Sequence, residues 1–189
     1  QGFRASQIIN WIHQKDCIDF NLMSNISLSM RSWLNENFTT ELLKVVLRQD
    51  SHDGTLKWLF QTDKGRIETV YIPHKNRGTL CVSSQVGCAL ACAFCATGSQ
   101  GLVRNLNCSE IIAQLYIANK ELTEMGQKKI SNIVFMGMGE PLMNEKHVYT
   151  AINLMLDDNA YGLAKSRVTV STSGIVPAMY RVIETTGAS

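Results

Sequence analysis

Three cysteines fall within eight residues of the sequence, as Cys88-Ala-Leu-Ala-Cys92-Ala-Phe-Cys95. Thiolates at this C-x3-C-x2-C spacing can hold three irons of a [4Fe-4S] cluster, which is usually anchored by four cysteines. The fourth iron is then open to an external ligand, which can receive an electron directly. The spacing therefore indicates a reactive iron–sulfur centre.

Two other interpretations of these cysteines stay open at this point. Positions 88, 92 and 95 also trace one helical face, so the Ala-rich segment 88–96 could be a short helix that buries inert thiols. A zinc site would need a fourth ligand. None of the four histidines, at positions 13, 52, 74 and 147, is close to the cysteines in sequence.

The composition excludes several broad classes of protein. A chain of 189 residues with 45% hydrophobic and 18% charged residues is typical of one or two packed domains and unlike a disordered protein. The net charge of +2 does not mark a nucleic-acid binder, although a local basic face is compatible with it. No apolar run reaches the roughly 18 residues of a membrane span, so we expect no membrane partner.

The cysteine usage points to a reducing compartment. Six cysteines could form three disulfides in a secreted protein, but three of them are clustered and no second cluster offers partners. No charged-then-apolar leader opens the chain, and a thiol cluster in a cytoplasmic protein usually serves metal or redox chemistry. We therefore expect a cytoplasmic protein.

The elements that must position the cysteines fall into two groups. Apolar spacing predicts helices at Phe3–Gln14 and Ser27–Phe38. Strand-like runs then predict an antiparallel meander, with turn signals at 51–54 and 63–65 between strands Leu42–Arg48, Thr55–Gln61 and Arg66–Ile72. We assign residues 1–76 to this small α+β accessory module.

Residues 77–189 alternate between strand and helix. The expected strands are Thr79–Ser83, Ile130–Met136 and Arg167–Ser171, and the expected helices are Ser109–Thr123, Val148–Leu156 and Pro177–Thr185. Such alternation predicts βαβ units, hence an α/β fold with a parallel sheet. Three units are too few to close a barrel, and the chain stops where a fourth strand is due. We expect the chain to be a piece of a longer protein.

Each predicted parallel strand ends in residues suited to ligand binding. The cysteine loop follows the first strand, Gly137-Met-Gly139-Glu140 follows the second, and Ser171-Thr-Ser-Gly174 follows the third. Glycines let a ligand approach the backbone, and Glu140 can accept hydrogen bonds from an amine or a sugar hydroxyl. Each segment alone could be an ordinary turn, but ligands of such sheets bind at these strand ends, so we expect one shared pocket.

Several segments together resemble the radical S-adenosylmethionine RNA methyltransferases of the RlmN type. They are Thr79-Leu-Cys81-Val-Ser-Ser-Gln-Val-Gly-Cys88, Ile67-Glu68-Thr-Val-Tyr-Ile-Pro73, Met136-Gly-Met-Gly-Glu-Pro141 and Val168-Thr-Val-Ser-Thr-Ser-Gly174. The resemblance implies a partial radical-SAM (βα) barrel, of which this chain would hold about the first three βα units. It also implies methylation of carbon-2 of adenine in 23S ribosomal RNA and transfer RNA.

The resemblance implies a role for eight residues. Cys88, Cys92 and Cys95 would bind the [4Fe-4S] cluster. Gly139, Glu140 and Ser171 would contact S-adenosyl-L-methionine. Glu68 would be the general base that removes the ring proton, and we expect its carboxylate to be partly desolvated. Cys81 would attack the sulfur of a covalent RNA–protein adduct, forming a disulfide bond and releasing the product.

In the same family one cofactor molecule methylates a cysteine, and a second yields a 5′-deoxyadenosyl radical that takes hydrogen from this methyl group. The methyl-carrying cysteine lies near the C-terminus of those proteins, and no position of this chain corresponds to it. We assign neither Cys17 nor Cys108 to catalysis, and we expect the 189 residues alone to be inactive.

Two other functions are compatible with the sequence. The sister family that methylates adenine at carbon-8 would keep the same three cysteine ligands. A zinc-stabilised RNA-binding module would have no catalysis. For the leading function we expect the ribosomal and transfer RNA substrates and an external electron donor, such as a flavodoxin-type protein, as partners.

Overall fold

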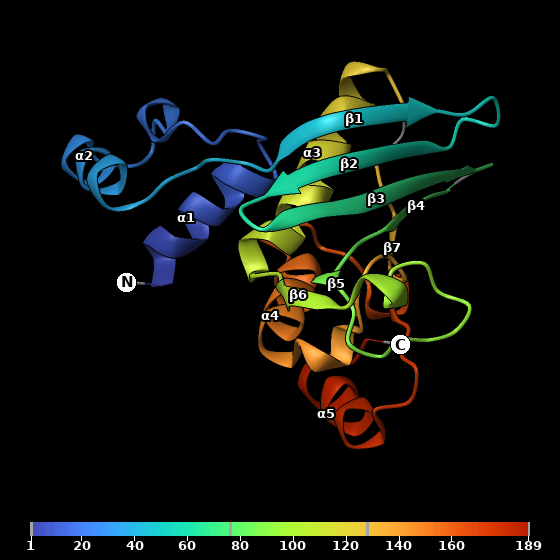
Figure 1. Cartoon of the computed structure of the whole chain (residues 1–189). Coiled ribbons are helices and arrows are strands. Elements are labelled where there is room, and N and C mark those ends of the chain that lie inside the picture. The colour runs from blue at the N-terminus through green and yellow to red at the C-terminus, as the bar shows by residue number, and fades with distance from the viewer. Residues whose placement is uncertain (1, 76, 128, 189) are drawn as a thin grey trace.

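The computed structural model describes residues 2–75, 77–127 and 129–188 (Figure 1). The accessory part begins with two predicted helices, α1 (Gly2–His13) and α2 (Leu28–Asn37), separated by the 3-10 helix η1 (Phe20–Leu22). The predicted meander is confirmed as the antiparallel strands β1 (Lys44–Asp50), β2 (Leu56–Thr62) and β3 (Gly65–His74).

The strands of the meander bury one face. Leu56, Trp58 and Phe60 alternate with half-buried residues along β2, as expected for a strand with one side in the core. The buried face packs on helix α3 (Cys108–Glu124), which lies behind the sheet in Figure 1. The Trp58 indole donates a hydrogen bond of 2.9 Å to Glu121 of that helix.

The predicted strand–helix alternation is also confirmed. After β4 (Arg77–Cys81) and α3 come β7 (Asn132–Phe135), α4 (Glu145–Leu156), β8 (Val168–Val170) and α5 (Val176–Thr186), with short 3-10 helices η3 (Pro141–Met143) and η4 (Lys165–Arg167). Strands β4, β7 and β8 are parallel neighbours. Within the described residues, six strands form one open sheet in the order β1-β2-β3-β4-β7-β8, a partial rather than a closed barrel.

The sheet continues across the predicted module boundary between residues 76 and 77. Strand β3 pairs antiparallel with β4, from Val70 opposite Cys81 to His74 opposite Arg77, and residue 76 itself lies outside the described residues. Buried side chains of β2, β3 and α3 belong to the same core cluster. The division into 1–76 and 77–189 therefore remains a prediction about folding units that share a sheet.

Two features differ from the expectations. The segment between β4 and α3 forms a hairpin of β5 (Gln85–Gly87) and β6 (Leu102–Asn105), with η2 (Gly98–Gln100) in its loop. Helix α3 begins at Cys108, one residue before the predicted start, and is capped by Asn107: the Asn107 side chain accepts from the Glu110 backbone N–H, and the Glu110 carboxylate accepts from the Asn107 backbone N–H. This reciprocal capping box satisfies two N–H groups at the helix start.

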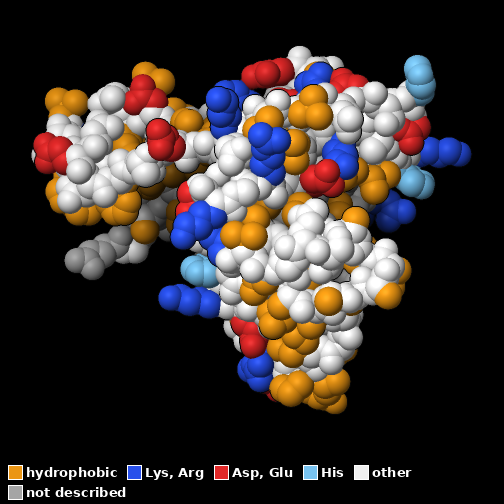
Figure 2. Space-filling view, in the orientation of Figure 1, with side chains coloured by type: hydrophobic (Ala, Val, Ile, Leu, Met, Phe, Trp, Pro, Cys, Tyr) orange, Lys and Arg blue, Asp and Glu red, His pale blue; other side chains and the backbone are white. Residues whose placement is uncertain are grey.

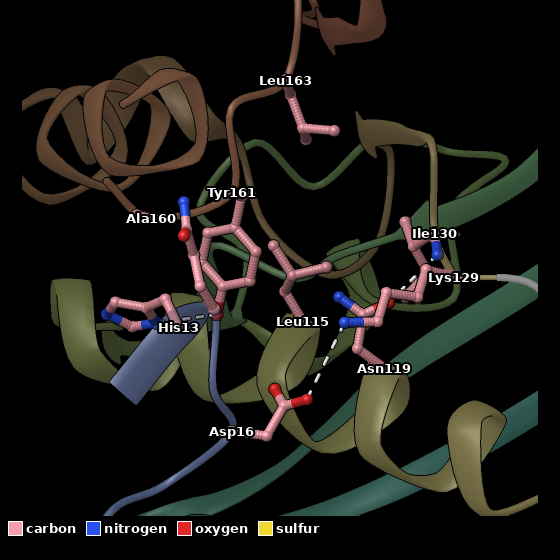
Figure 3. Close-up of a pocket in the computed structure, with 10 residues that line it drawn as sticks. His13, Asp16, Leu115, Asn119, Lys129, Ile130, Ala160, Tyr161 and Leu163 are labelled. Carbon is pink, nitrogen blue, oxygen red and sulfur yellow. Dashed lines mark hydrogen bonds and ion pairs between the residues drawn. The ribbon is translucent and has the colours of Figure 1, made fainter. Parts of the chain in front are cut away.

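A cavity of about 290 Å³ marks the contact between α1 and the α/β part (Figure 3). His13 at the end of α1 lies 3.0 Å from the Tyr161 hydroxyl, and Asp16 faces Lys129 at 3.8 Å. Burial lowers the pKa of His13 to about 4, although nearby Asp16 opposes the shift.

In the part of the chain that the structure describes, no helix is both long and apolar enough to span a membrane.

Candidate active site

The three clustered cysteines lie on the loop between β5 and β6. The loop is closed at its base by a hydrogen bond of 3.1 Å from the Cys88 N–H to the Gly101 carbonyl. Two successive turns then follow, in which the Cys95 N–H donates to Cys92 and the Gly98 N–H donates to Cys95, each at 3.0 Å. Residues 88–97 form no α-helix, so the interpretation as a helix with buried thiols was wrong.

The base of this loop is held firmly. Gly87 has φ +73°, and a Cβ there would collide with the Gly101 carbonyl. Arg104 of β6 forms ion pairs with Glu110 of α3, at 2.7 Å, and with Asp63 in the β2–β3 turn. A hydrogen bond from the Gly98 backbone lowers the pKa of the Cys95 thiol, which favours the thiolate that metals bind.

One cavity of about 250 Å³ collects six of the eight predicted site residues. It lies at the C-terminal ends of β7 and β8, where the cysteine loop covers them. Its lining includes Phe135, Met136 and Gly137 together with the predicted residues Cys88, Cys92, Cys95, Gly139, Glu140 and Ser171. The shared pocket expected from the strand ends is therefore present.

The donor atoms of this cavity suit an iron–sulfur cluster. Three thiols line it, although in the described part of the chain no three His, Cys, Asp or Glu side chains converge closely enough to hold a single metal ion. A zinc ion would need these side chains to converge on one point, which they do not do here. A cluster takes one thiolate at each of three irons, so three thiols spread along the cavity fit it better.

Glu140 links the ends of two parallel strands. Its side chain is 4% exposed. One carboxylate oxygen accepts a hydrogen bond from the Leu142 N–H at 3.0 Å, and the other accepts from the Ser173 N–H at 2.8 Å and the Ser173 hydroxyl at 3.1 Å. A carboxylate offers about four acceptor positions, so one is left for a ligand.

The glycines of the 137–140 loop are required by close packing. Gly139 has φ +95°, and a Cβ there would lie 2.8 Å from the Gln85 backbone nitrogen. Gln85 also accepts a hydrogen bond of 2.8 Å from the Glu140 N–H. The segment after β4 therefore lies directly against the loop that carries Gly139 and Glu140.

Glu68 lines a second cavity, of about 820 Å³, next to the first. It points from β3 to the same face as Val70, as predicted, and faces the cysteine loop at Ala96 and Thr97. Its carboxylate forms an ion pair of 2.7 Å with Lys57 of β2, with side chains 43% and 39% exposed. The carboxylate is therefore partly shielded from solvent, as expected, and its charge is paired with a lysine.

Cys81 lies at the end of β4 and is not among the residues that line the cavity of the three clustered cysteines. It lies beside Met136, which does line that cavity, and pairs with Val134 of β7. Burial raises the pKa of the Cys81 thiol, and a hydrogen bond from the Met136 backbone offsets part of the shift. All six cysteines are free, so the disulfide bond expected of Cys81 is not formed here.

A set of buried polar side chains supports the site and was missed in the sequence. Ser83, Gln85, Gln114 and Asn144 are each at most 3% exposed. Asn144 donates to the carbonyls of Ser84 and Leu106, at 2.9 and 2.7 Å. Two features of the sequence could have indicated these residues. One is the Ser-Ser-Gln run directly after a buried strand, and the other is a glutamine on an apolar helix face.

Comparison with known proteins gives two family matches. The family described as the ribosomal RNA large subunit methyltransferase N-terminal domain matches residues 1–40. The family described as the Radical SAM superfamily matches residues 82–188, which include the whole cysteine loop and the parallel strands β7 and β8, while β4 ends just before the match.

Individual relatives agree with these matches. The chain is 53% identical over 188 residues to the dual-specificity RNA methyltransferase RlmN of Ruthia magnifica and 52% identical over 183 residues to that of Buchnera aphidicola. The two alignments include 99% and 96% of this chain but only 52% and 50% of the two relatives. The chain therefore spans about half the length of the curated relatives it matches.

A solved structure is similar as well. The crystal structure of a radical SAM methyltransferase from Sphaerobacter thermophilus matches with a TM-score of 0.86 and 38% identity, over 95% of this chain and 53% of the other. Membership of the superfamily implies a [4Fe-4S] cluster and S-adenosylmethionine, in agreement with the three thiols of the cavity. The chain belongs to the radical SAM superfamily.

Proposed function

We propose that the full protein containing this chain methylates carbon-2 of adenine in 23S ribosomal RNA and transfer RNA, with S-adenosylmethionine as methyl donor. The observation that carries the proposal is the single cavity lined by Cys88, Cys92, Cys95 and the Gly139-Glu140 turn. The relatives named dual-specificity RNA methyltransferase RlmN support the choice of RNA as substrate.

In this proposal the cysteine cavity is the cofactor side of the site. Cys88, Cys92 and Cys95 would hold the cluster, which when bound supplies the electron for cleavage of S-adenosylmethionine. Gly139 gives the cofactor access to the backbone, Glu140 keeps one acceptor position for its amino group, and Ser171 presents a hydroxyl.

The larger cavity at Glu68 is the substrate side. Glu68 would accept the adenine ring proton, and its ion pair of 2.7 Å with Lys57 orients the carboxylate. Cys81 would then attack the adduct sulfur and break its bond to the RNA-linked carbon, so that a disulfide forms with a cysteine outside this chain; the released carbon takes up a proton, and the RNA leaves with a methyl group. An external electron donor and a cytoplasmic location belong to the same proposal.

The test is product analysis with the full-length protein. Anaerobically reconstituted enzyme is incubated with S-adenosylmethionine, a reductant and unmodified ribosomal or transfer RNA, and the RNA is digested to nucleosides for mass spectrometry. We expect 2-methyladenosine. Formation of 8-methyladenosine would assign the sister activity instead, and colourless, zinc-loaded protein without methylation would refute the enzyme.

A further inference from the structure

The two cavities of the site share one wall. Met138 lines the Glu68 cavity, whereas its neighbours Gly137 and Gly139 line the cysteine cavity. The 137–139 segment therefore separates the proposed base from the proposed cofactor, and the distance between the two depends on how this segment is fixed to strand β3.

Ser83 makes that connection. It is fully buried, and its hydroxyl donates to the Glu68 carbonyl at 2.6 Å while accepting from the Met138 N–H at 2.9 Å. Strand β4 ends at Cys81, opposite Val70, so Glu68 has no backbone partner on that side. The serine hydroxyl takes the place of the missing ladder bond.

Helix α3 holds Ser83 in place from behind. The buried Gln114 side chain accepts from the Ser83 N–H at 2.8 Å and donates to the Ser83 carbonyl at 3.0 Å. The same Gln114 oxygen accepts from the Thr69 hydroxyl at 2.7 Å, next to Glu68 on β3. Every polar atom of Ser83 is thus bonded, and a fully satisfied buried network of this kind is rigid.

We propose that Ser83 is a positioning residue that sets the spacing between Glu68 and the cofactor loop. The inference rests on the proposed function, because it assigns Glu68 to proton removal and the 137–140 loop to cofactor binding. When the hydroxyl is removed, both sides stay folded. Met138 is still held by the N–H groups of Ser84 and Gln85, and Glu68 is still paired with Leu59 of β2.

Removing the Ser83 hydroxyl should therefore leave cleavage of the cofactor intact, but fewer cleavage events should lead to methylation of adenine. In the full-length enzyme with RNA, we compare the amount of 5′-deoxyadenosine released with the amount of methylated adenine formed. For Ser83→Ala we expect this ratio to rise roughly tenfold, the factor that one buried hydrogen bond commonly contributes. A general loss of folded enzyme would lower both products together and leave the ratio unchanged.

Ser84→Ala is the matched control. Ser84 is also buried, but its hydroxyl makes a single contact of 3.5 Å with the Met138 carbonyl, so its ratio should stay near that of the wild type. Gln114→Glu, which changes one atom and turns the donor facing the Ser83 carbonyl into an acceptor, should also raise the ratio. It carries the test if Ser83→Ala cannot be purified.

The outcomes separate the two proposals. If the wild type makes no methylated adenine, the proposed function fails. If the wild type is active and both Ser83→Ala and Gln114→Glu keep the ratio of the Ser84→Ala control, the positioning role of Ser83 is overturned while the function stands.

Discussion

Glu140 and Ser173 are joined by two hydrogen bonds to one carboxylate oxygen, at 2.8 and 3.1 Å, which tie the loop after β7 to the loop after β8. Both loops line the cysteine cavity. This side-chain link therefore holds together two of the loops that line the cavity.

Glu140→Gln should weaken that link. An amide keeps only one acceptor oxygen, so a donor from Leu142 or Ser173 is left facing the NH2 group. We expect the free energy of unfolding to fall by about 1–3 kcal/mol, the usual effect of a broken buried hydrogen bond, together with weaker S-adenosylmethionine binding. Denaturant titration and calorimetric binding measure the two effects.

Glu145→Gln is the control for this prediction. Glu145 forms a bidentate, partly exposed ion pair with Arg181, at 2.7 Å. Such surface pairs contribute about 0.2–1 kcal/mol, so this variant should be the milder one and should bind the cofactor normally. Equal losses in both variants would contradict the role given to Glu140.

Gly139→Ala should damage the site more than an ordinary glycine substitution. Both Gly139, at φ +95°, and Gly126, at φ +68°, have backbone conformations that cost an alanine about 1–2 kcal/mol. A Cβ added at Gly139 would also lie 2.8 Å from the Gln85 backbone nitrogen, whereas a Cβ added at Gly126 would meet open space. Thermal unfolding should show a clearly larger loss for Gly139→Ala, and matching losses would argue against the close packing.

Cys81→Ala in the full-length enzyme should trap RNA on the protein. Without the attacking thiol, the adduct sulfur cannot be released as a disulfide, so a covalent RNA–protein species should accumulate on a denaturing gel. Cys17→Ala, at a cysteine far along the chain in the accessory part, should release product normally. Normal product release by Cys81→Ala would end the assignment of this residue.

His13 should make the protein less stable in acid. The pKa of His13 in the folded protein, about 4, is below the usual histidine value of about 6.5, so the unfolded state binds the proton more readily. The stabilising effect is therefore complete above pH 6.5 and is lost as the pH falls toward 4. Allowing for solvent screening, we expect about 1–2 kcal/mol over this window.

Denaturant titrations at pH 7 and pH 4 measure this effect. His13→Gln should reduce the difference in unfolding free energy between the two pH values. His52→Gln, at an exposed turn, should leave the difference as in the wild type. If His13→Gln has the same pH dependence as the wild type, the buried contact with Tyr161 shown in Figure 3 does not control acid stability.

Regular elements were predictable because each depends on a local pattern. The alternation of Leu56, Trp58 and Phe60 identifies β2 from neighbouring residues alone, and glycines after the second parallel strand mark a close backbone approach. The three cysteines could be assigned to one pocket because parallel strands end on the same edge of a sheet.

Features that depend on long-range contacts could not be predicted in this way. The ion-pair partner of Glu68 is Lys57, which lies on the neighbouring strand β2, and both side chains are partly exposed. Ser83 meets Glu68, Met138 and Gln114, which lie 15, 55 and 31 positions away. Figure 2 also shows exposed apolar side chains over α5. The local sequence likewise does not explain the exposure of Val176, Tyr180 and Ile183 on this helix.

The central claim is a cluster held by three cysteines with one iron open. Mössbauer spectroscopy of full-length protein reconstituted with ⁵⁷Fe tests it, recorded before and after addition of S-adenosylmethionine. We expect about one iron in four to change its signal when the cofactor is added. Cys88→Ala should lose the cluster and Cys108→Ala, outside the cavity, should keep it. A cluster in which no iron changes its signal on addition of the cofactor, or protein that binds no iron, would contradict a cluster with one open iron.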